Sequence, residues 1–449
     1  MWATFRAAVS LFILIGFFVF AFALIAGLMI GGFVLADSVA VLGVKAMVAA
    51  AVAALVVGFA LWTVAFLRPQ PKPGVDVTPE DAPELWALVT ELSDAAGSRG
   101  PEQIRLRPDV NAAVSEDSRF LGLIGGPRRM YLGVPLLQGL SVTQLRAVLA
   151  HEFGHYSSSH TRLGPIAYRG WQAVVATVEQ LQGNVIQWPL RFYAAVYILM
   201  SLAMSRSQER AADRLMVQVA GRANAQAALR EIHVIATAWS FYMNEYIALG
   251  WASDLAPTAD GFFGGFARVL AGHANEFDAI RAKAPPDESS PLDSHPPIAE
   301  RIAVMETLPD RTGPLRDDDR PASALIPSFA KAAAKTAEET YVLGWRERLE
   351  WDELAARVGA INDERTANIV YETAARLARE PTATLGTVVA LSEAGRAMEL
   401  VKTVAPDVSA EALEEVRRSV HPGGAGGGGA GRGRPMEVVL VRSVRAGDH

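Results

Sequence analysis

The chain has 449 residues, of which 51% are hydrophobic and 20% are charged, and it contains no cysteine. This composition is more apolar than that of an ordinary soluble enzyme, and the lack of thiols excludes cysteine nucleophiles and disulfides. The formal net charge of −6 argues against a nucleic-acid partner. Because the sequence has neither a P-loop nor a dinucleotide fingerprint, we expect no nucleotide partner.

The apolar excess lies near the N-terminus. Residues 7–36 and 46–67 carry no charged side chain, and each run is longer than the roughly 20 residues that cross a hydrocarbon core. We therefore expect a transmembrane helix pair in residues 1–70, with spans at about 8–36 and 45–67.

Flanking charges predict the orientation of this pair. Arg6, Arg68 and Lys72 lie on one side of the two runs, and only Lys45 lies in the short connection. Because basic residues mark the cytoplasmic side, we expect a multi-pass protein of the cell membrane with its N-terminus and the domain that follows the two spans in the cytoplasm. A secretory signal cleaved near residues 38–40 is the alternative, but the run is too long and a second span follows at once.

Residues 71–315 have the pattern of a folded domain with a small β-sheet. A Pro-rich linker leads into a helix near 80–95, and short strands follow it. An edge strand of such a sheet can pair with an extended peptide through its backbone. The expected strands are Ile104–Arg107, Ala112–Ser115, Phe120–Ile124 and Met130–Gly133.

His151, Glu152 and His155 form an H-E-x-x-H motif in a stretch that reads as helix. Since residues four apart share one helical face, both imidazoles can bind one zinc ion, and the glutamate can activate its water. Ser141 and Gln144 can form a capping box where this helix begins. The alternative is a surface helix with two solvated histidines.

A catalytic zinc ion needs a third protein ligand. The metzincin continuation is absent, because Ser158 and Thr161 stand where it requires glycine and histidine. Glu209 and Asp213 share one helical face, so Glu209 can bind the metal and Asp213 can fix the tautomer of a zinc-bound histidine. Taken alone, this pair is more typical of a charged surface segment.

Small residues favour close packing of the two predicted helices. Gly154 would let another element approach the first helix, and Ala211 and Ala212 would let the second helix come near enough to share one ion.

Together the two segments resemble the integral-membrane zinc metalloendopeptidase family that contains the HtpX heat-shock protease and the CAAX prenyl proteases. The resemblance covers roughly residues 79–308 and the preceding spans, and Asp293–Pro297 with Arg301 is similar to the family's late D-x-H-P…R segment. It implies that His295, steadied by Arg301, donates a hydrogen bond to the oxyanion.

Asn111, Ala112 and Ala113 resemble the N-A-x-A edge strand that lies along the substrate cleft in this family. The pattern departs at its end, where Ser115 follows Val114 and a final alanine would be near. The resemblance implies that this segment binds the substrate backbone.

A second apolar region, residues 163–205, lies between the two metal segments. The resemblance implies another membrane hairpin there, and its length fits a half-inserted or interfacial hairpin equally well. Amphipathic helices follow in a C-terminal extension at 320–420. Residues 421–449 are a Gly-rich linker and tail, and nothing in either segment indicates its role.

We therefore expect a mainly α integral-membrane protein with N-terminal transmembrane helices, a zincin-type domain with a small β-sheet, and a helical C-terminal extension. One zinc ion per chain would be held by His151, His155 and Glu209, while Glu152 takes a proton from the attacking water. The expected activity is cleavage of misfolded or membrane-associated proteins, and the expected partners are polypeptides and the lipid bilayer. The alternatives are a narrow-specificity CAAX-type protease and an inactive membrane scaffold. The sequence indicates no oligomeric state.

Overall fold

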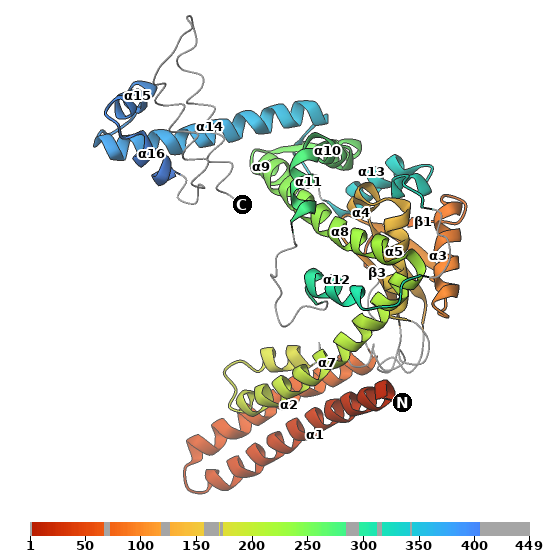
Figure 1. The fold of residues 1–449 in the computed structure, drawn as a ribbon. Helices are drawn as coiled ribbons and strands as arrows, with labels where there is room; N and C mark the ends of the chain where they lie inside the picture. Colours follow the sequence, from red (N-terminus) through yellow and green to blue (C-terminus); the bar gives the residue numbers. More distant parts are fainter. Residues whose placement is uncertain are drawn as a thin grey trace, which may run out of the picture. The chain divides into compact units, whose positions relative to one another are not determined.

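The computed structural model describes the residues 2–66, 72–117, 126–156, 170, 174–283, 296–311, 317–341 and 344–404. The chain divides into two compact units, one of residues 1–242 and 259–344 and one of residues 243–258 and 345–449. Most of the described residues are helical, and the first unit contains a small four-stranded sheet (Figure 1). This architecture confirms the predicted fold class.

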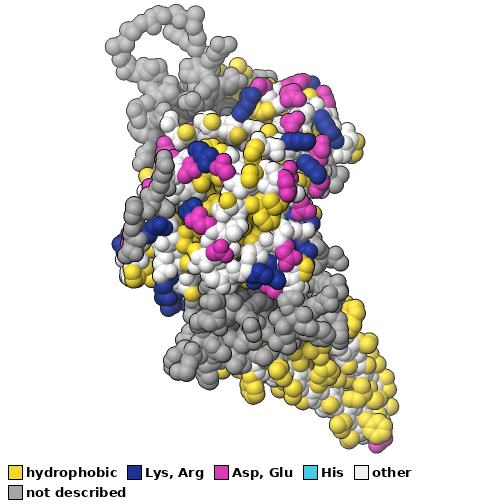
Figure 2. Space-filling view, turned by 90° about the vertical axis from the view of Figure 1, so that its right-hand side faces the viewer, with side chains coloured by type: hydrophobic (Ala, Val, Ile, Leu, Met, Phe, Trp, Pro, Cys, Tyr) yellow, Lys and Arg dark blue, Asp and Glu magenta, His cyan; other side chains and the backbone are white. Residues whose placement is uncertain are grey.

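The two longest apolar helices form an antiparallel pair at the N-terminus. They are α1 (Trp2–Ala36) and α2 (Ala40–Phe66), and the segments Phe12–Ala36 and Ala40–Trp62 are each long and apolar enough to cross a membrane. Large apolar side chains cover their outer surface, seen at the lower end of Figure 2. Such a continuous exposed apolar surface is typical of contact with lipid.

The connection between α1 and α2 is shorter than predicted. Only residues 37–39 lie between the helices, so Lys45 belongs to the second turn of α2 and not to the connection. The helices approach closely beside this turn, because a Cβ atom on Gly43 would lie 2.5 Å from the carbonyl oxygen of Gly32. Two facing glycines therefore permit the tight return of the chain.

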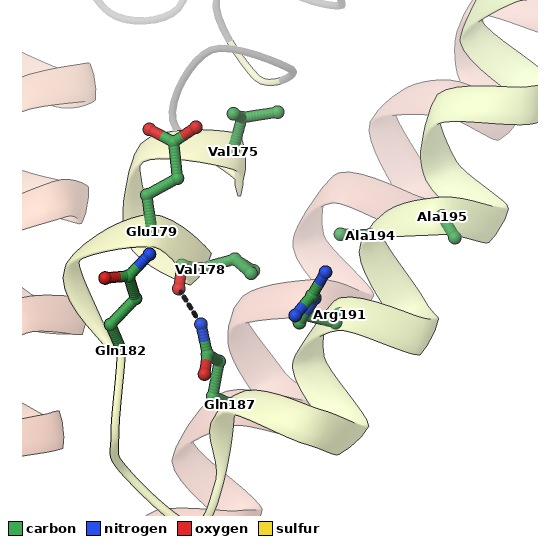
Figure 3. Close-up of a pocket in the computed structure, with 8 residues that line it drawn as sticks. All are labelled: Val175, Val178, Glu179, Gln182, Gln187, Arg191, Ala194 and Ala195. Atoms are coloured by element: carbon green, nitrogen blue, oxygen red, sulfur yellow. Dashed lines mark hydrogen bonds between the residues drawn. The ribbon is translucent and has the colours of Figure 1, made fainter.

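A helical hairpin packs against this pair. One arm is residues 174–180, and the other is the start of α7 (Gln187–Ala220). Asn184 at the tip donates a hydrogen bond of 2.8 Å to the carbonyl oxygen of Ala49, which lies near the middle of α2. The described part of the predicted hairpin (Figure 3) thus packs along the helix pair as far as Ala49 of α2, and its insertion into a membrane stays a prediction.

The sheet has the strand order β1-β2-β4-β3, with β2 and β4 parallel and the other pairs antiparallel. Strands were predicted at β2, β3 and β4, whereas the three-residue β1 is too short to give an alternating pattern. The predicted strand at 120–124 lies outside the described residues. The strands are β1 (Val75–Val77), β2 (Gln103–Arg107), β3 (Ala112–Glu116) and β4 (Arg128–Gly133).

Helices enclose the rest of the first unit. Trp239 and Tyr242 on α8 meet Phe262 and Phe266 on α10 in an aromatic cluster, with ring centroids 5.0–6.1 Å apart. These helices are α3 (Pro83–Ala95), α4 (Val134–Gly139), α5 (Val142–Gly154), α8 (Arg222–Tyr242), α10 (Ala259–Gly272), α11 (Ala274–Ala282), α12 (Ile298–Glu306), η3 (Ala322–Leu325) and α13 (Phe329–Thr340).

Residues 317–341 belong to this first unit, although the helical extension was predicted to begin at 320. A β-bridge joins Pro321 to Ser141, and the amide of Val142 donates to the carbonyl oxygen of Arg320. Such backbone contacts between distant segments leave no periodic signal in the sequence.

The second unit is mostly helical. Its helices α15 and α16 pack on α14 around the side chains of Val370, Leu391 and Leu400. The predicted tail, residues 421–449, lies outside the described residues. The elements of this unit are η2 (Met243–Ala248), α9 (Leu249–Ala252), β5 (Leu255–Pro257), β6 (Glu347–Leu349), α14 (Trp351–Ala378), α15 (Leu385–Glu393) and α16 (Ala397–Val404).

Candidate metal centre

The helix that carries the H-E-x-x-H motif is fixed at its start by the predicted capping box. The hydroxyl of Ser141 accepts from the amide of Gln144 at 3.2 Å, and the side-chain oxygen of Gln144 accepts from the amide of Ser141 at 2.9 Å. These bonds satisfy two amides that would otherwise lack helical partners. The register of α5, and so the direction of its histidines, is set locally.

Helices α5 and α7 touch where both carry small residues. A Cβ atom on Gly154 would lie 2.6 Å from the Cα atom of Ala212 and 3.0 Å from its Cβ atom. Ala212 is fully buried at this contact, whereas Ala211 is exposed. The predicted close approach is confirmed, and Ala212 is the alanine that permits it.

Close packing brings three ligand atoms together. The Nε2 atoms of His151 and His155 are 3.1 Å apart, and the carboxylate oxygens of Glu209 lie 3.6 Å from the first and 3.4 Å from the second. Zinc bonds to nitrogen or oxygen of about 2.0–2.1 Å in a tetrahedron imply ligand separations of about 3.3 Å. Two imidazole nitrogens and one carboxylate at this spacing fit a zinc ion.

Asp213 lies against the first histidine. Its Oδ1 atom lies 3.1 Å from Nδ1 of His151 and 2.6 Å from Nη2 of Arg301. With Nε2 of His151 facing the other candidate ligands, a proton on Nδ1 would be donated to the same oxygen of Asp213 that accepts from Arg301. Burial alone would raise the pKa of Asp213, but the hydrogen bonds from His151 and Arg301 outweigh it and lower the pKa to about 2.

Arg301 lies behind the ligands, among groups that hold His151. Its Nε atom is 3.2 Å from both carboxylate oxygens of Asp213, and its Nη2 atom is 3.0 Å from Nδ1 of His151. The side chain of Arg301 is 9% exposed, and Asp213 compensates its charge inside the protein. The sequence placed Arg301 beside His295, which lies outside the described residues.

Glu152 and the edge strand β3 flank the metal ligands. Glu152 is half-buried on α5 between the two histidines. Ala112 and Ala113 pair with Leu132 and Tyr131 on one side of β3, and among the residues that the structure describes β3 is the last strand of the sheet. Asn111, next to this strand, is exposed, and its carbonyl oxygen accepts from the amide of Gly133 at 2.7 Å.

Tyr156 joins the metal helix to this edge, a link that the sequence did not reveal. Its hydroxyl donates a hydrogen bond of 2.7 Å to the carbonyl oxygen of Val114, and the guanidinium of Arg128 lies 4.7 Å from its ring centroid. In an antiparallel ladder the backbone groups of successive residues point to opposite sides of the strand. Those of Ala113 face β4, so the carbonyl oxygen of Val114 faces away from β4, toward the outer edge of β3. In the sequence, the only sign of this link is an aromatic residue directly after His155.

Known proteins are similar in sequence to the part of the chain that contains the metal cluster. Residues 79–308 match the model of peptidase family M48. Protease HtpX homologs from Listeria innocua serovar 6a and Listeria monocytogenes serotype 4a are each 26% identical over 246 residues, which cover 51% of this chain and 75% of each relative.

No solved structure matches the chain. The matched region contains all three residues of the metal cluster together with Asp213 and Arg301. Because the family model covers just over half of the sequence, the chain belongs to peptidase family M48.

Proposed function

We propose that this protein is a membrane-anchored, zinc-dependent endopeptidase. The observation that carries the proposal is the cluster of His151, His155 and Glu209, whose ligand atoms have the separations of a tetrahedral site. Family membership supports peptide hydrolysis by the same residues.

The residues around the cluster would each have a separate role in peptide hydrolysis. A zinc ion held there supplies Lewis-acid polarisation of the scissile carbonyl and lowers the pKa of the attacking water. Glu152 takes the proton of that water and later passes it to the leaving amine. Asp213, itself held by Arg301, would accept a proton from Nδ1 of His151 and so favour the tautomer that leaves Nε2 free for the metal.

Two roles in this proposal come from the family resemblance. His295 would donate to the oxyanion of the tetrahedral intermediate. Asn111, Ala112 and Ala113 would bind the substrate backbone along β3, the last strand of the sheet in the described part of the chain. Backbone pairing depends little on side chains, so it suits misfolded or membrane-associated polypeptides of varied sequence.

Cleavage by a matched pair of variants tests the catalytic proposal. Wild type, Glu152→Gln and Glu300→Gln would be purified in detergent and tested for bound zinc and for casein hydrolysis. Glu300 is an exposed glutamate on α12 and serves as the control. We expect zinc in all three proteins and cleavage in wild type and Glu300→Gln only. Equal cleavage by Glu152→Gln would end the assignment of Glu152 as the base.

We also propose that α1 and α2 span the cell membrane with the catalytic unit in the cytoplasm. The supporting observation is the excess of Arg and Lys on the side of the catalytic unit. The chain has no cysteine, so single introduced cysteines at the exposed residues Glu80 and Ser38 report each side cleanly. An impermeant thiol reagent on intact cells should label the cysteine at 38 and spare that at 80, and the reverse pattern would invert the orientation.

A further inference from the structure

The outer edge of β3 presents backbone groups at every second residue. The carbonyl oxygen of Asn111 accepts from the amide of Gly133 on β4 at 2.7 Å. Because bonded and unbonded residues alternate along an antiparallel ladder, Ala113 faces β4 as Asn111 does. Ala112 and Val114 therefore direct their amides and carbonyl oxygens to the outer edge. An extended peptide that pairs with this edge would meet both residues.

One of these two outward carbonyl oxygens already accepts a hydrogen bond within the protein. The hydroxyl of Tyr156 donates to the carbonyl oxygen of Val114 at 2.7 Å, a usual length for an O–H···O bond. Tyr156 directly follows His155 at the end of α5, and this helix contacts β3 (Figure 1). Among the residues that the structure describes, no side chain donates to the carbonyl oxygen of Ala112. The two acceptors therefore differ.

Arg128 on β4 holds the ring of Tyr156 in this position. Its guanidinium lies 4.7 Å from the ring centroid, within the range of a cation–π contact. The guanidinium is itself fixed, since it donates to the carboxylate of Glu116 at 2.9 Å and to the hydroxyl of Ser98 at 2.8 Å. A ring that packs on a fixed group has little freedom to rotate, so its hydroxyl stays on Val114.

The hydroxyl of Tyr156 and a substrate amide compete for the same oxygen. A substrate amide gives up its hydrogen bond to water on binding, and it recovers this loss only if the strand offers an acceptor. Opposite Ala112 an acceptor is present. Opposite Val114 the acceptor is occupied, so an amide there is left unpaired. A residue without an amide hydrogen, such as proline, avoids this cost.

We propose that Tyr156 is a specificity-determining residue, which keeps the carbonyl oxygen of Val114 from accepting a substrate amide. Substrate recognition then uses a backbone amide opposite Ala112 and none two residues away, opposite Val114. Polypeptides with proline at this second position are the class of substrate that the edge favours. The inference rests on the proposed peptidase function and on β3 as the strand that binds substrate.

Peptides that carry single ester bonds test the proposal. Replacing an amide by an ester removes the N–H donor without adding bulk. A peptide that wild type cuts at one bond would be prepared with an ester at each other position around that bond. Wild type, Tyr156→Phe and Tyr193→Phe would be compared by kcat/KM. Tyr193 is the matched control, because its hydroxyl also donates to a backbone carbonyl oxygen, that of Ile13, at 3.0 Å.

We expect Tyr156→Phe to gain one ester-sensitive position that wild type and Tyr193→Phe lack. This position should lie two residues from one that is sensitive in all three proteins. The ester should lower kcat/KM there by about 2- to 10-fold, the effect of one backbone hydrogen bond. The zinc content of Tyr156→Phe should equal that of wild type, which excludes a change at His155 as the cause. The same set of sensitive positions in all three proteins would overturn the proposal.

The ester series on wild type alone covers the case in which Tyr156→Phe does not fold. Pairing with an edge strand makes every second substrate amide a donor, so sensitivity should skip one member of this series. Proline at the skipped position should leave kcat/KM within about twofold of that for the parent peptide, since no hydrogen bond is lost there. Unbroken sensitivity at every second position would overturn the proposal without any variant.

Affinity measurements separate this inference from the proposed activity. Fluorescently labelled peptides of the same series would be bound to Glu152→Gln, alone and combined with Tyr156→Phe, and followed by anisotropy. The double variant should be weakened by one ester that Glu152→Gln tolerates. A lack of cleavage by wild type would contradict the proposed activity alone, whereas equal tolerance of every ester by both proteins would overturn the role of Tyr156.

Discussion

Substitution of Gly154 by alanine tests how the two metal helices are held together. The added Cβ atom would lie 2.6 Å from the Cα atom of Ala212, whereas ordinary contacts begin at 3.4 Å. Because the obstructing atom is backbone, no side chain can rotate away. Helix α7 must therefore move locally by about 1 Å, and Glu209, one turn before Ala212, moves with it.

This displacement sets the expected magnitude. Overpacking of a close contact costs about 1–3 kcal/mol of folding free energy. The higher helix propensity of alanine than of glycine offsets up to about 1 kcal/mol of this cost. Zinc sites tolerate bond-length changes of only about 0.2 Å. The larger effect should therefore be on metal binding, and we expect the zinc affinity to fall about 10- to 100-fold, as it does when a supporting group is lost.

The assay is zinc competition against a chromophoric chelator, with thermal unfolding measured in parallel on the detergent-purified protein. Gly264→Ala is the control, because a Cβ atom on this helical glycine would meet nothing within 4 Å. It should retain wild-type zinc affinity and unfold at the same or a slightly higher temperature. If Gly154→Ala binds zinc as tightly as wild type, the close contact does not position Glu209.

Three further predictions concern the same centre. Asp213→Asn weakens the acceptor shared by His151 and Arg301 and should lower zinc affinity about 10- to 100-fold; an unchanged affinity in the chelator assay would refute its positioning role. Tyr156→Phe frees the carbonyl oxygen of Val114 for a substrate amide, so KM for an extended peptide should fall severalfold with kcat unchanged, and a rise in KM would contradict this edge as the binding strand. Chelation should lower the unfolding temperature and added zinc should restore it, because an ion at 100 times its Kd stabilises the folded state by about 2.7 kcal/mol. An unfolding temperature that chelation leaves unchanged would argue against a zinc ion bound by His151, His155 and Glu209.

Local patterns predicted the helix of the metal site well. The capping box at Ser141 and the i,i+4 spacing of His151 and His155 are properties of a single helix, so the sequence alone specifies them. Glu209 was less secure, because its spacing to Asp213 is also typical of a solvated surface. The contact between Gly154 and Ala212, which brings the two helices together, is what places Glu209 beside His151 and His155.

Long-range contacts could not be predicted in this way. Arg301 is separated from Asp213 by 88 residues, and no spacing rule links a lone arginine to a distant carboxylate. The same holds for Tyr156 and the carbonyl oxygen of Val114, which are 42 residues apart. Both links arise only when helices and sheet pack, since hydrogen bonds of this kind depend on tertiary geometry.

The central claim is that His151, His155 and Glu209 together hold one zinc ion. Its most direct test is the zinc content, measured by elemental analysis, of wild type, Glu209→Ala and Glu276→Ala, where Glu276 is an exposed glutamate on α11. We predict about one zinc per chain in wild type and Glu276→Ala and almost none in Glu209→Ala. A full complement of zinc in Glu209→Ala would contradict the claim.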